Sequence, residues 1–85
     1  MIERRKLENT IRSPYYWVEH ILTEHKDYFL TKEEIYREIP KDENELPCIT
    51  ISGLETAIRN MLLCRVIVCE YVKGTRYFAI NEKKN

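Results

Sequence analysis

Residues 66–80 read VIVCEYVKGTRYFAI, and this stretch decides the fold. Apolar side chains recur at every second position in both of its halves, which is the period of a half-buried β-strand. The Lys-Gly pair at 73–74 separates the halves and supplies the glycine that a tight hairpin loop favours. This loop pairs apolar residues on one face, Cys69 with Phe78 and Ile67 with Ile80. The stretch therefore predicts a two-stranded antiparallel hairpin.

The segment before the hairpin has the pattern of an amphipathic helix. Residues 52–55, Ser-Gly-Leu-Glu, have the form of a capping box, in which Ser52 caps the first turn and Glu55 reaches back to it. Apolar residues then recur three and four positions apart, at Leu54, Ala57, Ile58, Met61 and Leu62. We expect a helix that begins at Ser52 and ends near Cys64.

A shorter helix is predicted upstream. Thr31 and Glu34 have the spacing of another capping box, and Leu30 and Ile35 flank this start at the positions of a hydrophobic staple. Pro40 ends the helix, because proline lacks the N–H that a helix interior needs. The polar segment that follows, up to Thr50, has neither a helical nor a strand period, so we expect a loop there.

The first helix is predicted to begin at Ser13-Pro14, a capping residue followed by proline at the first helical position, where the missing N–H costs nothing. An apolar stripe that includes Val18 and Leu22 continues to about Asp27. Residues 28–30, Tyr-Phe-Leu, have the composition of a very short strand between the first and second helices.

Length and composition indicate one soluble domain. A chain of 85 residues has room for a single core, and 44% hydrophobic with 33% charged residues is typical of a globular protein. No apolar run approaches the roughly 18 residues of a membrane span, and we recognise no signal peptide, so we expect a cytoplasmic protein without a membrane partner. The expected organisation is an N-terminal arm at 1–12, a domain at 13–80 and a tail at 81–85.

The net charge of zero hides an asymmetry along the chain. Residues 23–46 contain eight acidic and four basic side chains, whereas residues 47–85 contain six basic and three acidic ones. A molecule with one basic and one acidic side approaches phosphates in one preferred orientation, because its field steers the encounter.

Catalysis and metal binding are not indicated. The three cysteines form no C-x-x-C pair and have no histidine at zinc-ligand spacing, so we expect small buried side chains, with an intracellular disulfide as the alternative. His20 and His25 are five positions apart, which is off one helix face, and we find no Ser-His-Asp grouping or glycine-rich phosphate loop. We expect no enzyme activity, no metal and no cofactor.

The order helix, short strand, helix, helix, hairpin resembles the winged helix-turn-helix family over residues 13–80. Residues 30–35, LTKEEI, resemble the family's second helix start, residues 51–62 resemble its recognition helix, and residues 66–80 resemble its wing. The resemblance implies an α+β fold and a transcription regulator that binds duplex DNA. In length and composition the chain is also similar to small archaeal and archaeal-virus regulators.

Two departures from that family concern the connections. The loop at 40–50 is longer than the turn that usually joins the second and third helices, and Arg65 stands where the family often has glycine before the wing.

The resemblance also implies which side chains contact DNA. Arginine pairs bidentately with guanine and asparagine with adenine, whereas serine, threonine and lysine suit phosphates or base edges. On the helix, the outward candidates are Ser52, Thr56, Arg59 and Asn60. At the wing tip, the candidates for the phosphate backbone or the minor groove are Lys73, Thr75 and Arg76. For both groups a merely solvated surface is the alternative, as it is for a basic arm formed by Arg4, Arg5, Lys6 and Arg12.

Aromatic residues are concentrated in the first half of the chain, at Tyr15, Tyr16, Trp17, Tyr28, Phe29 and Tyr36. We expect most of them to fill the core. Those left outside on the first helix, or the N-terminal arm, would form a homodimer interface suited to half-sites about one DNA turn apart. The zero net charge and the acidic stretch favour an alternative, a winged helix that contacts protein in a larger assembly without binding DNA.

Overall fold

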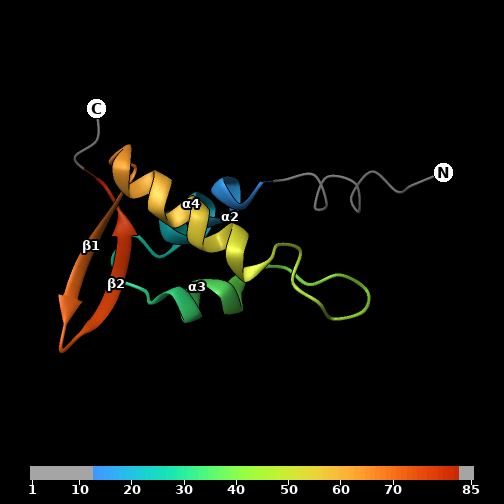
Figure 1. Cartoon of the computed structure of the whole chain (residues 1–85). Helices are drawn as coiled ribbons and strands as arrows, with labels where there is room; N and C mark the ends of the chain where they lie inside the picture. The colour runs from blue at the N-terminus through green and yellow to red at the C-terminus, as the bar shows by residue number, and fades with distance from the viewer. Residues whose placement is uncertain (1–12, 83–85) are drawn as a thin grey trace.

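The computed structural model describes residues 13–82, so the expected arm at 1–12 with its four basic residues, and residues 83–85 of the expected tail, lie outside it. Five elements follow one another along the chain: α2 (Pro14–Glu24), α3 (Lys32–Glu38), α4 (Ile51–Leu63), β1 (Ile67–Val72) and β2 (Thr75–Ile80). Figure 1 shows the three helices packed together and the hairpin along one side of them. This is the α+β arrangement that the sequence predicts, and it is consistent with a winged helix.

The core is formed by apolar side chains from every element. Trp17 is buried along with the apolar stripe of α2, as is Phe78 of β2. The largest fully buried side chains of the core are those of Leu22, Ile35, Leu54, Ile67 and Val18. Because burying one such side chain contributes roughly 1.5–3 kcal/mol, these contacts fix α4 and the hairpin relative to one another. No helix within residues 13–82 combines the length and apolarity that crossing a membrane requires.

Helix α2 begins as expected and ends early. The Ser13 side chain accepts a hydrogen bond from the Tyr16 N–H, and Pro14 occupies the first turn. The helix ends at Glu24 instead of near Asp27, with His25 as its C-cap. The reason is that residues 23–27 are all polar and provide no apolar side chain to bury against the core.

Helix α3 confirms the capping box in both directions. The Thr31 hydroxyl accepts from the Glu34 N–H at 3.1 Å, and the Glu34 carboxylate accepts from the Thr31 N–H at 2.8 Å. Leu30 and Ile35, the staple positions, are both buried. The helix stops at Glu38, before Pro40.

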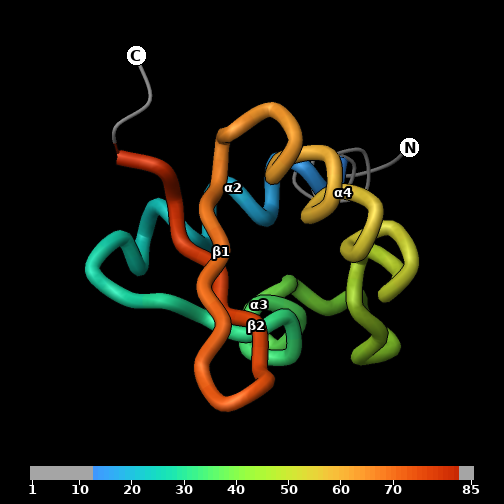
Figure 2. The backbone as a smooth tube through the Cα atoms, turned by 60° about the vertical axis from the view of Figure 1, so that its left-hand side comes forward, coloured from blue at the N-terminus to red at the C-terminus, as the bar shows by residue number. Residues whose placement is uncertain are grey.

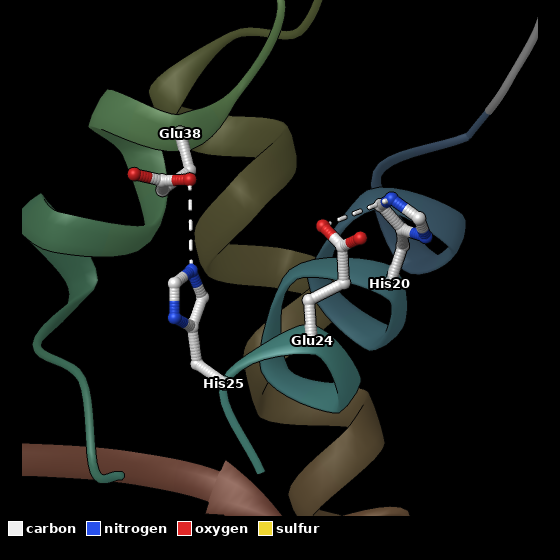
Figure 3. Close-up of polar contacts among 4 residues, drawn as sticks. All are labelled: His20, Glu24, His25 and Glu38. Carbon is white, nitrogen blue, oxygen red and sulfur yellow. Dashed lines mark ion pairs between the residues drawn. The ribbon is translucent and has the colours of Figure 1, made fainter.

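Two histidines at the surface pair with glutamates. Within α2, His20 Nε2 lies 3.4 Å from Glu24 Oε1. At the C-terminal end of α2, His25 Nε2 lies 3.6 Å from Glu38 Oε1 of α3 (Figure 3). All four side chains are 40% exposed or more, so these pairs contribute at most about 1 kcal/mol each. The His25 pair joins the last turns of α2 and α3.

The start of α4 differs from the prediction. Thr50, rather than Ser52, is the N-cap: its hydroxyl accepts from the Gly53 N–H at 3.0 Å, and the expected capping box with Glu55 is absent. A cap at Thr50 brings buried Ile49 and Leu54 to the two staple positions, whereas a cap at Ser52 would bring polar Thr56 to one of them.

Gly53 allows α4 to approach α2. A Cβ at this position would lie 3.2 Å from the Thr50 hydroxyl and 3.3 Å from a side-chain carbon of Pro14. A larger residue would press on the cap and on the start of α2 at once.

Arg65 adopts a left-handed conformation, φ 63°, at the end of α4. Its N–H donates to the Leu62 carbonyl at 3.1 Å and the Val66 N–H donates to the Met61 carbonyl at 2.9 Å, which is a Schellman motif. The Asn81 side chain then donates to the Arg65 carbonyl at 2.8 Å and ties the end of β2 to this turn. Glycine is the usual residue here, so the departure noted in the sequence is a strained position.

The hairpin has the expected register. Cys69 pairs with Phe78 and Ile67 with Ile80, and the 73–74 loop has φ 52° and 83°, as a type I′ turn requires. The expected short strand at 28–30 is a single bridge, in which Leu30 exchanges two backbone hydrogen bonds with Phe78, of 2.8 and 2.7 Å. Figure 2 shows this connection between α2 and α3 passing beside the hairpin.

The loop at 40–50 is held by a local hydrogen-bond network. The Asp42 carboxylate accepts from the N–H groups of Asn44 and Leu46, and its own N–H donates to the Leu46 carbonyl. Although most of this loop is polar, Ile49 is 8% exposed and packs in the core.

Candidate nucleic-acid interface

A hollow of about 240 Å³ lies where the start of α3, the middle of α4 and β2 meet. We call it the charged groove, and its lining residues are Lys32, Glu55, Ile58, Arg59, Arg76 and Phe78. Three different elements thus supply one cation each, two of which, Arg59 and Arg76, are site residues predicted from the sequence. Ile58 and Phe78 are almost fully buried, so an apolar floor supports the charged rim.

Lys32 and Glu55 form an ion pair across the groove. The Lys32 Nζ donates to Glu55 Oε2 at 2.6 Å, which joins the first residue of α3 to α4. This hydrogen bond is the main cause that raises the pKa of Lys32, so the ammonium stays charged far above neutral pH. The nearby positive charge of Arg76 lowers the same pKa, which indicates that the two cations are close enough to repel each other.

Arg76 is held against the hairpin instead of projecting from its tip. Its guanidinium lies 5.1 Å from the Phe78 ring centre and 5.9 Å from that of Tyr71, within the range of cation–π attraction. Hydrogen bonding to Cys69 is the main cause that raises the Arg76 pKa. The fixed guanidinium is therefore directed along the groove-facing side of the hairpin.

The sequence assigned Arg76 to the wing tip, and its strand position explains the difference. Arg76 pairs with Tyr71 in the register, one step before the pair at the loop. Because side chains alternate along a strand, Arg76 lies on the same face as Phe78, which is buried against the helices. Lys73 and Thr75 do lie at the tip, where both are exposed.

The outward face of α4 retains three of its four predicted residues. Ser52, Thr56 and Arg59 are exposed. Asn60 is half-buried at the contact with α2, where its amide donates to the Tyr15 hydroxyl at 2.5 Å. The structure therefore does not bring Asn60 together with the charged groove.

Lys32 and Glu55 are groove residues that the sequence analysis did not identify. They are 23 positions apart, and no local pattern predicts their contact. The capping-box interpretation also assigned Glu55 to the helix start, which hid its position on the outward side of α4.

The last part of the acidic stretch lies away from the charged groove. Its loop, residues 40–50, projects at the opposite end of the molecule from the hairpin (Figure 1). Asp42, Glu43 and Glu45 are exposed there. The acidic loop and the charged groove are thus separated in space, whereas Glu33 of the same stretch lies near Lys32. An approaching polyanion meets the hairpin end more favourably than the loop.

A second surface is apolar. Tyr15 and Tyr16 of α2 remain 41% and 36% exposed, and beside them a hollow of about 330 Å³ extends along Met61, Cys64 and Val66. We call this surface the aromatic face. At the end of α4 the Leu63 side chain is 77% exposed, the highest value of any large hydrophobic residue in the described chain. Of the six aromatic residues in the first half of the chain, only Trp17 and Tyr36 pack inward, so the expectation that most of them fill the core is wrong.

The three cysteines are free thiols that differ in burial. Cys48 and Cys69 are half-buried, and Cys64 is exposed, so the expectation of burial is wrong for Cys64. Its position as the C-cap of α4 keeps it outside the core. Within residues 13–82, no three side chains among His, Cys, Asp and Glu come close enough to hold a metal ion.

Comparison with known proteins gives no match for this chain. No family model, no curated protein and no solved structure matches the chain. The charged groove and the aromatic face are therefore the features from which a function can be inferred.

Proposed function

We propose that the protein is a sequence-specific transcription regulator that binds duplex DNA, with α4 in the major groove and the hairpin on the backbone or in the minor groove. The observation that carries the proposal is the convergence of Lys32, Arg59 and Arg76, from three elements, on one groove. Phosphates are neutralised by such clusters of lysine and arginine.

The shape of α4 is compatible with this mode of binding. The major groove of B-DNA is about 12 Å wide and admits one helix with its side chains. Ser52, Thr56 and Arg59 form an exposed face on α4, and Lys32 and Arg76 border that face. A helix flanked by cations on the neighbouring elements is suited to inserting between two phosphate strands.

Fluorescence anisotropy with a labelled duplex at 50 and 200 mM salt tests the proposal. If Lys32, Arg59, Lys73 and Arg76 each displace about one counterion, affinity should fall about 100-fold between these concentrations. The control is Lys41→Ala, which removes an exposed cation from the acidic loop and should leave the salt dependence unchanged. Absence of binding at 50 mM salt would exclude the DNA function.

The aromatic face supports a second proposal, contact with protein. Tyr15 and Tyr16 are exposed beside its apolar hollow, and tyrosine is enriched in protein interfaces. The partner is a second copy of this chain if the protein binds paired half-sites, or another protein if it acts as an interaction module in a larger assembly. Light scattering separates these outcomes: a dimer mass supports the first, and a monomer that also fails to bind DNA supports the second.

A further inference from the structure

Glu55 is an acidic side chain on a surface proposed to meet a polyanion. Its side chain is 52% exposed, and it lines the charged groove beside Arg59 and Arg76. A carboxylate only accepts hydrogen bonds, so against DNA it is repelled by phosphates and by the acceptor atoms of the bases. The Glu55 carboxylate is favourable at this position only if a hydrogen-bond donor of the DNA contacts it.

The donors that the major groove offers are few. Guanine presents two acceptors, thymine an acceptor and a methyl group, adenine an amino group next to the N7 acceptor, and cytosine an amino group alone. Beside adenine, the second oxygen of a carboxylate faces the N7 acceptor of the same base and is repelled, whereas cytosine itself carries no acceptor on its major-groove edge. Cytosine is therefore the base that suits Glu55.

Lys32 holds Glu55 in position for this contact. Its Nζ occupies one carboxylate oxygen, Oε2, at 2.6 Å. A carboxylate has about four acceptor positions, so the pair leaves acceptor capacity for a base amino group. Because the ion pair already restricts the side chain, less conformational entropy is lost on binding.

Arg59 lies one helical turn further along α4. Four residues correspond to about 6 Å along the helix axis. Successive bases are about 3.4 Å apart, so side chains at this spacing reach base pairs one or two steps from each other.

We propose that Glu55, held by Lys32, selects cytosine, and that Arg59 selects a guanine one or two base pairs away. This inference rests on the proposed function, because it names the sequence preference of the same surface. It makes Glu55 a specificity-determining residue.

Selection of bound duplexes from a randomised pool, with the wild type and Glu55→Gln, tests the proposal. Glutamine pairs bidentately with adenine, so one position should change from cytosine to adenine, while the guanine preference one or two steps away is kept. In anisotropy titrations with duplexes that differ at this pair, the preference of about tenfold for cytosine should invert.

The matched control is Glu33→Gln, which removes the same charge from an exposed position that also acts on Lys32. It should raise affinity for all duplexes to a similar extent without changing the selected base. If Glu55→Gln does the same, Glu55 only holds Lys32, and the inference is wrong. Circular-dichroism melting checks that both variants fold.

Failure of the inference differs from failure of the proposed function. If the wild-type protein binds duplexes but the selected sequences show no preference for cytosine and guanine at this spacing, the inference alone is overturned. Wild-type protein that binds no duplex at low salt overturns both.

Discussion

Helix α4 borders both the charged groove and the aromatic face, and the two surfaces differ in how their side chains are held. In the groove, Lys32 and Arg76 are fixed by an ion pair and by aromatic rings. On the aromatic face, Tyr15 makes one hydrogen bond to Asn60, and the apolar hollow beside it stays open. One surface holds its charged side chains in fixed positions, and the other leaves apolar area exposed.

This difference separates the two kinds of binding that we propose for this small domain. Binding in the groove depends on charge, so it should weaken with salt. Binding at the aromatic face depends on apolar area, so salt should affect it little. Variants on the two surfaces should therefore change different measurements, and a variant that changes both would break the distinction.

The largest effect is expected for Arg59→Ala. Loss of a bidentate contact to guanine costs about 1–3 kcal/mol, so affinity for the preferred duplex should fall about 5- to 150-fold, with reduced discrimination at one base pair. Anisotropy titrations with the preferred duplex and a duplex changed at that pair measure both quantities.

Arg37→Ala is its control, because Arg37 is exposed on α3 and does not line the charged groove. Unchanged binding by Arg59→Ala would mean that α4 does not enter the DNA groove.

Local patterns in the sequence correctly predicted the starts of α2 and α3 and the hairpin, whereas the start of α4 was predicted two residues late. The capping box at Thr31 and Glu34 and the pairing of Cys69 with Phe78 depend on residues that are close in sequence or related by one turn. The cap at Thr50 was also readable, because only that choice brings Ile49 and Leu54 to the staple positions.

The candidate site was less predictable, because tertiary contacts decide it. The helical period of α4 places Asn60 on its outward side, but this period carries no information about the neighbouring helix α2. There the Tyr15 hydroxyl accepts a hydrogen bond from the Asn60 amide. The contact between Lys32 and Glu55 likewise exists only after α3 packs near α4. The position of Arg76 was within reach of the sequence, since strand alternation from Phe78 leads to it.

A smaller effect, on association, is expected for Tyr16→Ser. If the aromatic face joins two copies, removal of a central tyrosine should weaken the dimer about tenfold or more, since interface tyrosines often contribute 2 kcal/mol. Sedimentation or light scattering over a concentration series measures this. Tyr28→Ser removes an even more exposed tyrosine outside that face and should not change the mass. Equal effects of the two variants would argue against a specific interface.

Lys73→Ala should have a smaller effect on DNA binding than Arg59→Ala, and of a different kind. Lys73 lies exposed in the loop of the hairpin and contacts phosphate in the proposed complex. Its removal should weaken all duplexes by a similar few-fold factor and reduce the slope of log affinity against log salt by about 0.9. A change in base preference would instead place the wing tip against base edges.

The smallest effect is expected at Arg65, which lies in the turn between α4 and β1 and does not line the charged groove. A non-glycine residue in the left-handed region costs about 1–2 kcal/mol, part of which glycine returns through the greater entropy of its unfolded chain. Arg65→Gly should therefore stabilise the fold by about 0.5–1 kcal/mol and raise the Tm by about 2–8 °C. Arg65→Ala removes the same charge but keeps the Cβ, so it should give no such gain. We expect Arg65→Gly to raise the Tm and to leave both the DNA affinity and the oligomeric mass unchanged. A change in global stability would then affect neither property. The losses expected in Arg59→Ala and Tyr16→Ser could therefore be assigned to the charged groove and the aromatic face.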